Sequence, residues 1–136
     1  MGNRNVLRWD CDAQGCFNKL LRPKIELFSE VLPGLNAFTD VDGLTMIGGR
    51  FLLVEWKSRY SEPPKWGGQG RALRELTKVA PVTVIMVVGD AETMDVRGWG
   101  KLVDGEWSGW SQIDLFRLRE AIKEWGVKAD QTVSSV

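Results

Sequence analysis

The clearest pattern along the chain is a pair of apolar runs separated by two glycines. Apolar residues dominate positions 38–47 and 50–58, and Gly48 and Gly49 lie between them. Two glycines between apolar runs are typical of a two-residue β-hairpin turn, because such turns need positive φ angles. We therefore predict an antiparallel hairpin in which the numbers of facing positions sum to 97, beginning with 47 and 50.

Apolar residues at helical spacing predict helices over residues 24–32 and 68–79. A last helix is predicted from Ser111, where Asp114 three residues later completes a capping box, and Gly126 is expected to end it. We expect the tail over residues 127–136 to be frayed.

A continuous β-branched run at residues 82–88 is typical of a strand that is covered on both faces. Shorter strands are expected near residues 94–99 and 101–103. This order predicts an α/β fold with a mixed central sheet flanked by helices, and the length of 136 residues predicts a single domain over residues 1–136.

The hairpin brings acidic groups together. With a two-glycine turn, Asp42 lies directly opposite Glu55, and Asp40 lies directly opposite Lys57. Strand alternation places these four side chains on one face and Trp56 on the other, where we expect it to pack. Facing carboxylates about 5 Å apart repel each other, and a divalent cation between them would replace this repulsion with coordination. The pair therefore indicates a metal-dependent enzyme.

The composition narrows the available chemistry. The chain contains no histidine, which excludes Ser-His-Asp and Cys-His catalysis and histidine-ligated metals. Cys11 and Cys16 are too few for a disulfide framework and supply only half of a structural zinc site. Hydrolysis would then depend on carboxylates, lysine and a hard cation such as Mg²⁺, which prefers oxygen ligands.

The net charge of the chain bears on a nucleic-acid partner, and its hydropathy bears on a membrane location. The 18 basic and 18 acidic side chains cancel, so no overall field attracts nucleic acid. No apolar run approaches the roughly 20 residues that a membrane-spanning helix needs, and the first residues lack the apolar core of a secretion signal. We expect a cytoplasmic protein with no membrane partner.

Asp42, followed after 13 positions by Glu55-Trp56-Lys57, matches the Asp…(Asp/Glu)-X-Lys pattern of the PD-(D/E)XK nuclease superfamily. The surrounding sequence resembles small phage and prophage members and, more loosely, VRR-NUC and RecB-type nuclease domains. The resemblance covers about residues 23–90, and no proline precedes either Asp40 or Asp42. It implies a restriction-endonuclease-like fold, with an αβββαβ core, a mixed central sheet flanked by helices, and here a C-terminal helix.

The resemblance also implies roles for the hairpin residues. Asp42 and Glu55 would bind Mg²⁺ or Mn²⁺, with the backbone carbonyl of Trp56 as a further ligand. Lys57 would orient or activate the attacking water and balance charge at the phosphate, in keeping with the chemistry of metal-bound water. Asp40 is an alternative, either supporting the ligands or, if the hairpin carries a bulge, serving as the ligand itself.

Two predicted helices add candidate catalytic groups by the same resemblance. Glu26, or else Glu30, would bring a third carboxylate from the first helix, although an exposed helix face explains either residue equally well. Gln69 would approach the site from the start of the second helix, as in RecB-like members, unless it is simply a polar residue at a helix start.

Basic residues beyond the Lys57 strand are candidates for nucleic-acid contacts, and one tryptophan among them for stacking on an unpaired base. Solvated charges on a helix are the alternative explanation. The set is Arg59, Lys65, Trp66, Arg71 and Arg74.

The function predicted from the sequence is hydrolysis of DNA phosphodiester bonds in the cytoplasm of a bacterium or a phage-infected host cell. The small size favours a homodimer or a partner protein, and RNA stays open as the substrate. The competing interpretation is a non-catalytic nuclease-fold binding protein, such as a phage factor that engages a host nuclease or nucleic-acid complex. The zero net charge favours that alternative.

Overall fold

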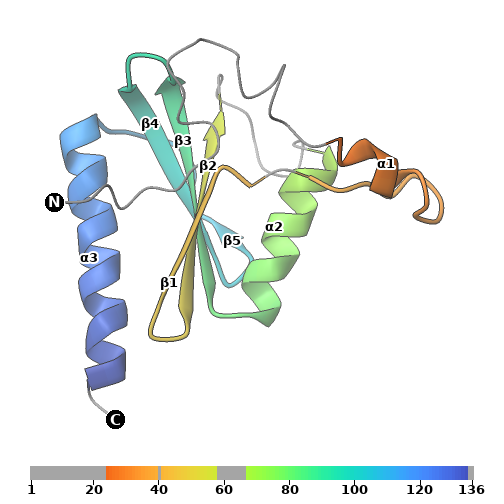
Figure 1. Ribbon diagram of the computed structural model, residues 1–136. Helices are drawn as coiled ribbons and strands as arrows, with labels where there is room; N and C mark the ends of the chain where they lie inside the picture. The colour runs from red at the N-terminus through yellow and green to blue at the C-terminus, as the bar shows by residue number, and fades with distance from the viewer. Residues whose placement is uncertain (1–23, 40, 58–66, 135–136) are drawn as a thin grey trace, which may run out of the picture. The chain divides into compact units, whose positions relative to one another are not determined.

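The computed structural model describes residues 24–39, 41–57 and 67–134 (Figure 1). The chain divides into two compact units, residues 1–38 and 39–136, and the single domain expected from the length stays a prediction.

The first unit contains α1, a single turn at Glu26–Ser29. The predicted helix over residues 24–32 is therefore too long. Ile25 at its N-cap supplies no side-chain hydrogen bond, and none of the four helical residues is buried, so neither capping nor packing lengthens the turn. The chain after α1 folds back, and the Phe38 N–H donates to Ser29 Oγ at 2.9 Å.

The second unit is built on a mixed sheet, which confirms the α/β class. The described strands are β1 (Gly43–Ile47), β2 (Arg50–Lys57), β3 (Val82–Asp90), β4 (Asp95–Val103) and β5 (Glu106–Trp107), in that spatial order, and β6 (Ser111–Gln112) also pairs with β4. β2 and β3 are parallel, and the other pairs are antiparallel.

The hairpin register is confirmed. The pairs run from Ile47 opposite Arg50 to Gly43 opposite Val54. Gly48 and Gly49 form the turn with φ angles of 59° and 79°, the left-handed region that glycine adopts without a steric cost.

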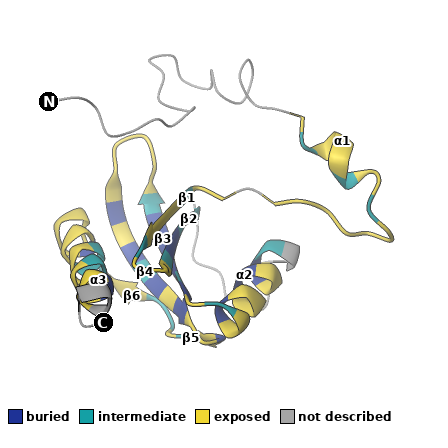
Figure 2. Cartoon of the chain, turned by 60° about the horizontal axis from the view of Figure 1, so that its bottom comes forward, coloured by how far each residue is buried: buried dark blue, intermediate teal, exposed yellow. Residues whose placement is uncertain are grey.

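Two helices cover the two faces of the sheet (Figures 1 and 2). α2 (Gly67–Val79) connects β2 to β3, as the parallel pairing requires, and its Leu73 packs against Leu53 and Met86. α3 (Leu115–Ser134) covers the other face, where its Leu118 packs against Ile85.

Strand alternation in β2 distributes its side chains between these two layers. Leu53 belongs to the α2 layer, whereas Leu52, Val54 and Trp56 belong to the α3 layer. The predicted packing of Trp56 on the face opposite Glu55 is confirmed, and its Nε1–H donates to the Gly89 carbonyl at 3.1 Å.

The C-terminal helix differs from the prediction at both ends. Ser111 belongs to β6, and Asp114 is the capping residue, since its Oδ1 accepts the Arg117 N–H at 2.8 Å. Gly126 does not end the helix, which continues to Ser134 through the region expected to fray. A Cβ placed on Gly126 would lie 3.6 Å from Ile47 Cδ1, an ordinary contact distance, so this glycine lies where α3 packs against the hairpin.

The strands after α2 also differ in detail from the prediction. The two short strands expected near 94–99 and 101–103 form one strand, β4, whose register with β3 shifts between Val88 and Gly89. The predicted αβββαβ core has three strands between its two helices, and the described residues place two there, β1 and β2. None of the described helices is both long and apolar enough to cross a membrane.

We predict opposite effects for two glycine substitutions. Gly100→Ala would place a Cβ 2.7 Å from Trp107 Cζ2 and 2.8 Å from the Gly109 carbonyl oxygen, so Trp107 must move. We expect a loss of about 1–3 kcal/mol in the free energy of unfolding. Gly126→Ala should instead add about 0.5–1 kcal/mol, because alanine favours the helix and the Ile47 contact is of ordinary length.

Urea unfolding followed by tryptophan fluorescence measures both effects. An unchanged unfolding midpoint for Gly100→Ala would show that Trp107 does not pack closely against Gly100 of β4.

Candidate active site

The candidate site lies where the β1–β2 ladder ends, immediately before Gly43. The Asp42 N–H donates to Glu55 Oε1 at 3.2 Å, and the Trp56 N–H donates to Asp42 Oδ2 at 2.7 Å. Each acidic side chain therefore accepts a backbone N–H from the neighbouring segment. The predicted meeting of Asp42 and Glu55 is confirmed, and it consists of reciprocal side-chain-to-backbone bonds.

Glu55 is the buried member of the pair, with 2% of its surface exposed. The pKa of its carboxyl is raised from an ordinary value of 4.5 to about 7, first by burial and second by the negative charge of Asp42. The Asp42 N–H, the positive charge of Lys57 and the hydrogen bond from Gln69 act in the opposite direction. Burial has the largest effect, so this carboxylate would gain from a cation beside it.

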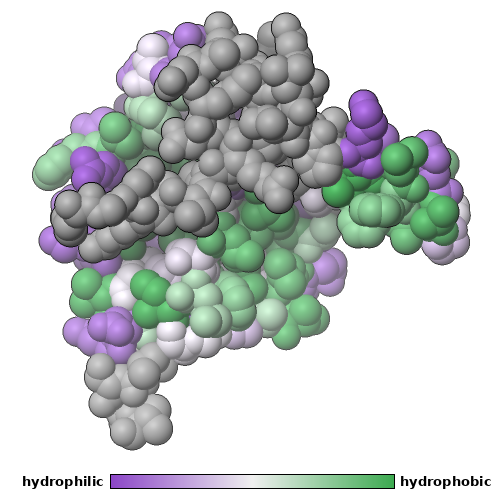
Figure 3. Space-filling view, viewed as in Figure 1, coloured by the Kyte–Doolittle hydropathy of each residue, from purple (hydrophilic) through white to green (hydrophobic). Residues whose placement is uncertain are grey.

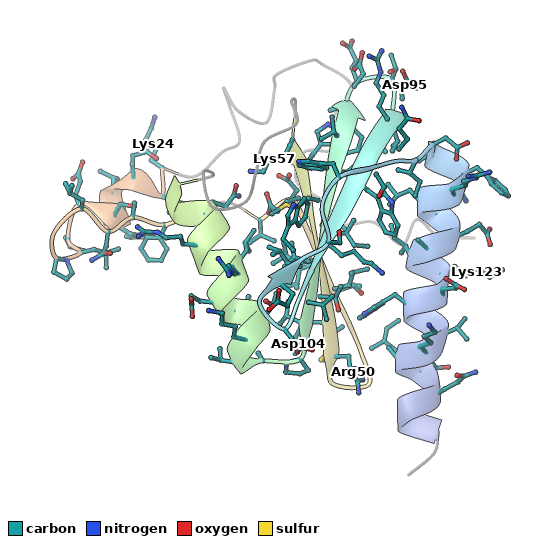
Figure 4. All side chains as sticks on the ribbon, turned by 180° about the vertical axis from the view of Figure 1, so that it is seen from behind. Lys24, Arg50, Lys57, Asp95, Asp104 and Lys123 are labelled. Atoms are coloured by element: carbon teal, nitrogen blue, oxygen red, sulfur yellow. The ribbon has the colours of Figure 1, made fainter. Side chains whose placement is uncertain are left out.

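Gln69 joins the buried acid to the lysine. Its Nε2–H donates to Glu55 Oε2 at 2.9 Å, and its Oε1 accepts a hydrogen bond from Lys57 Nζ at 2.5 Å. Gln69 lies in the first turn of α2, directly above the face of β2 that carries Glu55 and Lys57. Figure 4 shows Lys57 at the opposite end of the hairpin from Arg50 at the turn. The predicted approach of Gln69 to the acids is therefore observed.

The oxygen atoms at this point fit a hard divalent cation. The described residues hold no cluster of three or more acidic, cysteine or histidine side chains, so Asp42 and Glu55 would be the only side-chain ligands among them. Trp56 adds a backbone carbonyl, which points to the same side as its N–H, toward Asp42 and past the end of β1. One or two carboxylates, with water and substrate oxygens, are the usual protein share of a Mg²⁺ site.

Several other predicted site residues lie in the first unit or outside the described residues. Glu26 lies in α1 and Glu30 follows it, both in the first unit, so a contribution of either to the site stays a prediction. Asp40, Arg59, Lys65 and Trp66 lie outside the described residues.

The two predicted basic residues of α2 lie on its exposed surface. Arg71 is exposed, and the Arg74 Nε–H donates to the Gly105 carbonyl at 3.0 Å. Thr77, which is buried, accepts the Gly105 N–H at 2.9 Å. Arg74 thus helps to fix the β4–β5 turn, a structural role that the sequence analysis missed because its partner is a backbone carbonyl distant in sequence.

Comparisons with protein-family models, with curated proteins and with solved structures found no match to this chain. The resemblance to PD-(D/E)XK nucleases therefore depends on the residues themselves and on the geometry that they adopt.

The raised pKa of Glu55 predicts a pH-dependent stability in metal-free buffer. Between about pH 4.5 and 7 the folded chain holds a proton on Glu55 that the unfolded chain has released, so stability falls as the pH rises through this range. Glu55→Gln should remove this slope, because glutamine does not titrate. Its amide NH₂ must face one of the two N–H donors, so the gain in stability at pH 8 should be smaller than about 3 kcal/mol, the value that 1.36 kcal/mol per pKa unit gives.

The measurement is urea unfolding at several pH values from 5 to 8 in EDTA, with the exposed Glu124→Gln as the matched control. Parallel pH profiles for Glu55→Gln and the unsubstituted protein would show that Glu55 has an ordinary pKa.

Proposed function

We propose that this chain is a metal-dependent nuclease of the PD-(D/E)XK type that hydrolyses DNA phosphodiester bonds with Mg²⁺ or Mn²⁺. The observation that carries the proposal is the grouping of Asp42, Glu55 and Lys57 at the end of one hairpin, with Gln69 bridging the last two. A buried carboxylate beside a second carboxylate is unfavourable without a cation, which favours a binding role over a purely structural one.

Each residue has a definite part in this proposal. Asp42, Glu55 and the Trp56 carbonyl would hold the cation, which polarises the phosphoryl oxygen and lowers the pKa of bound water. The Lys57 ammonium would stabilise charge that develops on the phosphate. Gln69 would keep Lys57 and Glu55 at a fixed separation, because its amide group bonds to both side chains.

The order of elements supports the assignment of a restriction-endonuclease-like core. We assign the antiparallel β1–β2 hairpin, α2 and the parallel strand β3 to the part of that core which carries the signature. In this assignment the Asp/Glu-X-Lys strand is β2, covered on both faces, and the helix that follows it lies over the acidic residues.

Substitution of the lysine tests catalysis. We expect metal-dependent cleavage of DNA by the unsubstituted protein and a loss of at least about 100-fold with Lys57→Met, since removal of one preorganised charge stabiliser typically costs 10²–10³ in rate. The assay uses single-stranded, duplex and branched DNA with Mg²⁺, Mn²⁺ or EDTA. Lys123→Met, an exposed lysine on α3, is the matched control and should cleave normally.

A chain that binds DNA but cleaves none of these substrates with either metal would favour the competing function, a non-catalytic binding protein that retains the fold. Equal cleavage by Lys57→Met and Lys123→Met would remove Lys57 from the proposed mechanism. Cleavage of RNA alone would change the substrate and leave the site in place.

Substitution of the exposed acid tests metal binding separately from catalysis. Asp42→Asn can still accept the Trp56 N–H, but it removes one charged ligand and the charge that raises the Glu55 pKa. We expect loss of Mn²⁺ binding in calorimetry at pH 8, with a melting temperature in EDTA that is unchanged or slightly higher. Asp104→Asn, at the β4–β5 turn, should bind Mn²⁺ normally.

A large drop in the melting temperature of Asp42→Asn in EDTA would show that Asp42 has a structural role instead.

A further inference from the structure

The two edges of the sheet are protected very differently. At one edge, β4 is covered by two short strands, β5 and β6, of two residues each. At the other edge, β1 has five residues, Gly-Leu-Thr-Met-Ile, and it pairs on one side with β2. Edge strands are usually protected by charges, prolines or bulges. β1 has no charged residue and no proline, and its register with β2 is uninterrupted.

Exposed apolar side chains lie on the sheet face beside this edge. Leu44 and Met46 are 63% and 57% exposed, and they face Leu53 and Phe51 of β2, which places them on the α2 side of the sheet. On α2, Leu76 and Val79 are 38% and 80% exposed. In the view of Figure 3, hydrophobic side chains gather over β1 and α2. Among the described strands, only β2 pairs with β1, and an unpaired strand edge beside apolar side chains is the usual target of an added β-strand.

We propose that β1 pairs with β1 of a second copy of this chain, antiparallel and centred on Thr45, so that two sheets join into one. In this register the facing positions sum to 90: Thr45 meets Thr45, Leu44 meets Met46, and Gly43 meets Ile47 of the second copy. A two-fold interface requires a surface that complements itself. The sequence of β1 satisfies this requirement, because its apolar pair is arranged symmetrically around a central threonine.

Charge and register both favour this occupant. All five pairs are uncharged, so no like charges oppose each other, and facing threonines are a favourable cross-strand pair. A slip by one residue would turn the second strand over, which places its Leu44 and Met46 on the opposite face of the joined sheet and separates the apolar side chains. The two-fold axis stands perpendicular to the joined sheet, so both copies of α2 lie on the same side.

This pairing has a consequence that rests on the proposed nuclease function. Asp42 directly precedes β1, so the two copies of Asp42 lie six residue steps apart along the paired strands, roughly 20 Å at about 3.4 Å per residue. Both sites lie on the α2 side of one sheet and are related by a two-fold axis. The two strands of duplex DNA are related in the same way, and we infer that the dimer cuts both strands of a duplex in one encounter.

The oligomeric state tests the pairing without any assay of cleavage. We expect sedimentation velocity to show a species of twice the chain mass, 15.3 kDa. The double variant Leu44→Lys/Met46→Lys places lysines opposite lysines and should raise the dimer dissociation constant at least 100-fold. Phe116→Lys/Val127→Lys, which changes two exposed apolar residues of α3, is the matched control and should remain dimeric. Circular dichroism confirms that each variant is folded.

A charge-swapped variant identifies the occupant and the register. In Leu44→Lys/Met46→Glu, each lysine faces a glutamate of the second copy, so the dimer should return. If this variant stays monomeric as the double-lysine variant does, self-pairing in this register is wrong. An unsubstituted protein that is monomeric at every concentration also overturns the proposal and leaves the edge to a strand of another protein.

Cleavage of supercoiled plasmid separates this inference from the proposed function. If both hold, the unsubstituted protein converts plasmid directly to the linear form, and the double-lysine variant produces nicked circles at a comparable rate. A dimer without any cleavage overturns the nuclease proposal and preserves the pairing. Direct linearisation by the monomeric double-lysine variant overturns the link between pairing and paired cuts.

Discussion

The burial of the Glu55 carboxylate is the constraint on which the candidate site depends. A carboxylate that is 2% exposed has lost most of its hydration, and this cost is partly offset by two donors, the Asp42 backbone N–H and the Gln69 amide. For the Asp42 N–H to reach Glu55, strand β1 must begin immediately after Asp42. The second donor requires α2 to begin over the end of β2. The hairpin and the helix are thus fixed around the same carboxylate.

Much of this arrangement could be predicted from sequence because it follows from short-range rules. The two-glycine turn set the hairpin register, and the period of two along β2 then placed Glu55 and Lys57 on one face and Trp56 on the other. The bounds predicted for α2 differ from the structure by a single residue, since its apolar spacing is regular and Pro81 follows it. These features depend on neighbours in sequence, which a single chain displays directly.

The errors arose where tertiary packing overrides local preference. Gly126 suggested a helix end, but it lies inside α3 at the point where Ile47 approaches. Ser111 resembled a helix cap, but it pairs with Trp99 as part of β6. Within the site, the sequence predicted two facing acids and could not show that each accepts a backbone N–H from the other segment. The direction of an N–H beyond the end of a strand is not encoded by the type of side chain at that position.

The hydrogen bonds to Glu55 favour its ionised form, whereas burial raises the pKa of the carboxyl and favours the neutral form. A bound cation would stabilise the ionised form without disturbing the hydrogen bonds. Both carboxylate oxygens accept N–H groups, which is the arrangement expected for the ionised form. Burial nevertheless favours the neutral form at pH values below about 7. A proton on either oxygen would have to share that oxygen with a donor already in place, whereas a divalent cation can use a remaining lone pair and leave both N–H contacts intact. The positive charge of Lys57 lowers the pKa of Glu55, but burial and the negative charge of Asp42 have larger effects in the opposite direction. The surroundings are therefore organised for a carboxylate that stays ionised beside a stronger positive charge than the described residues provide.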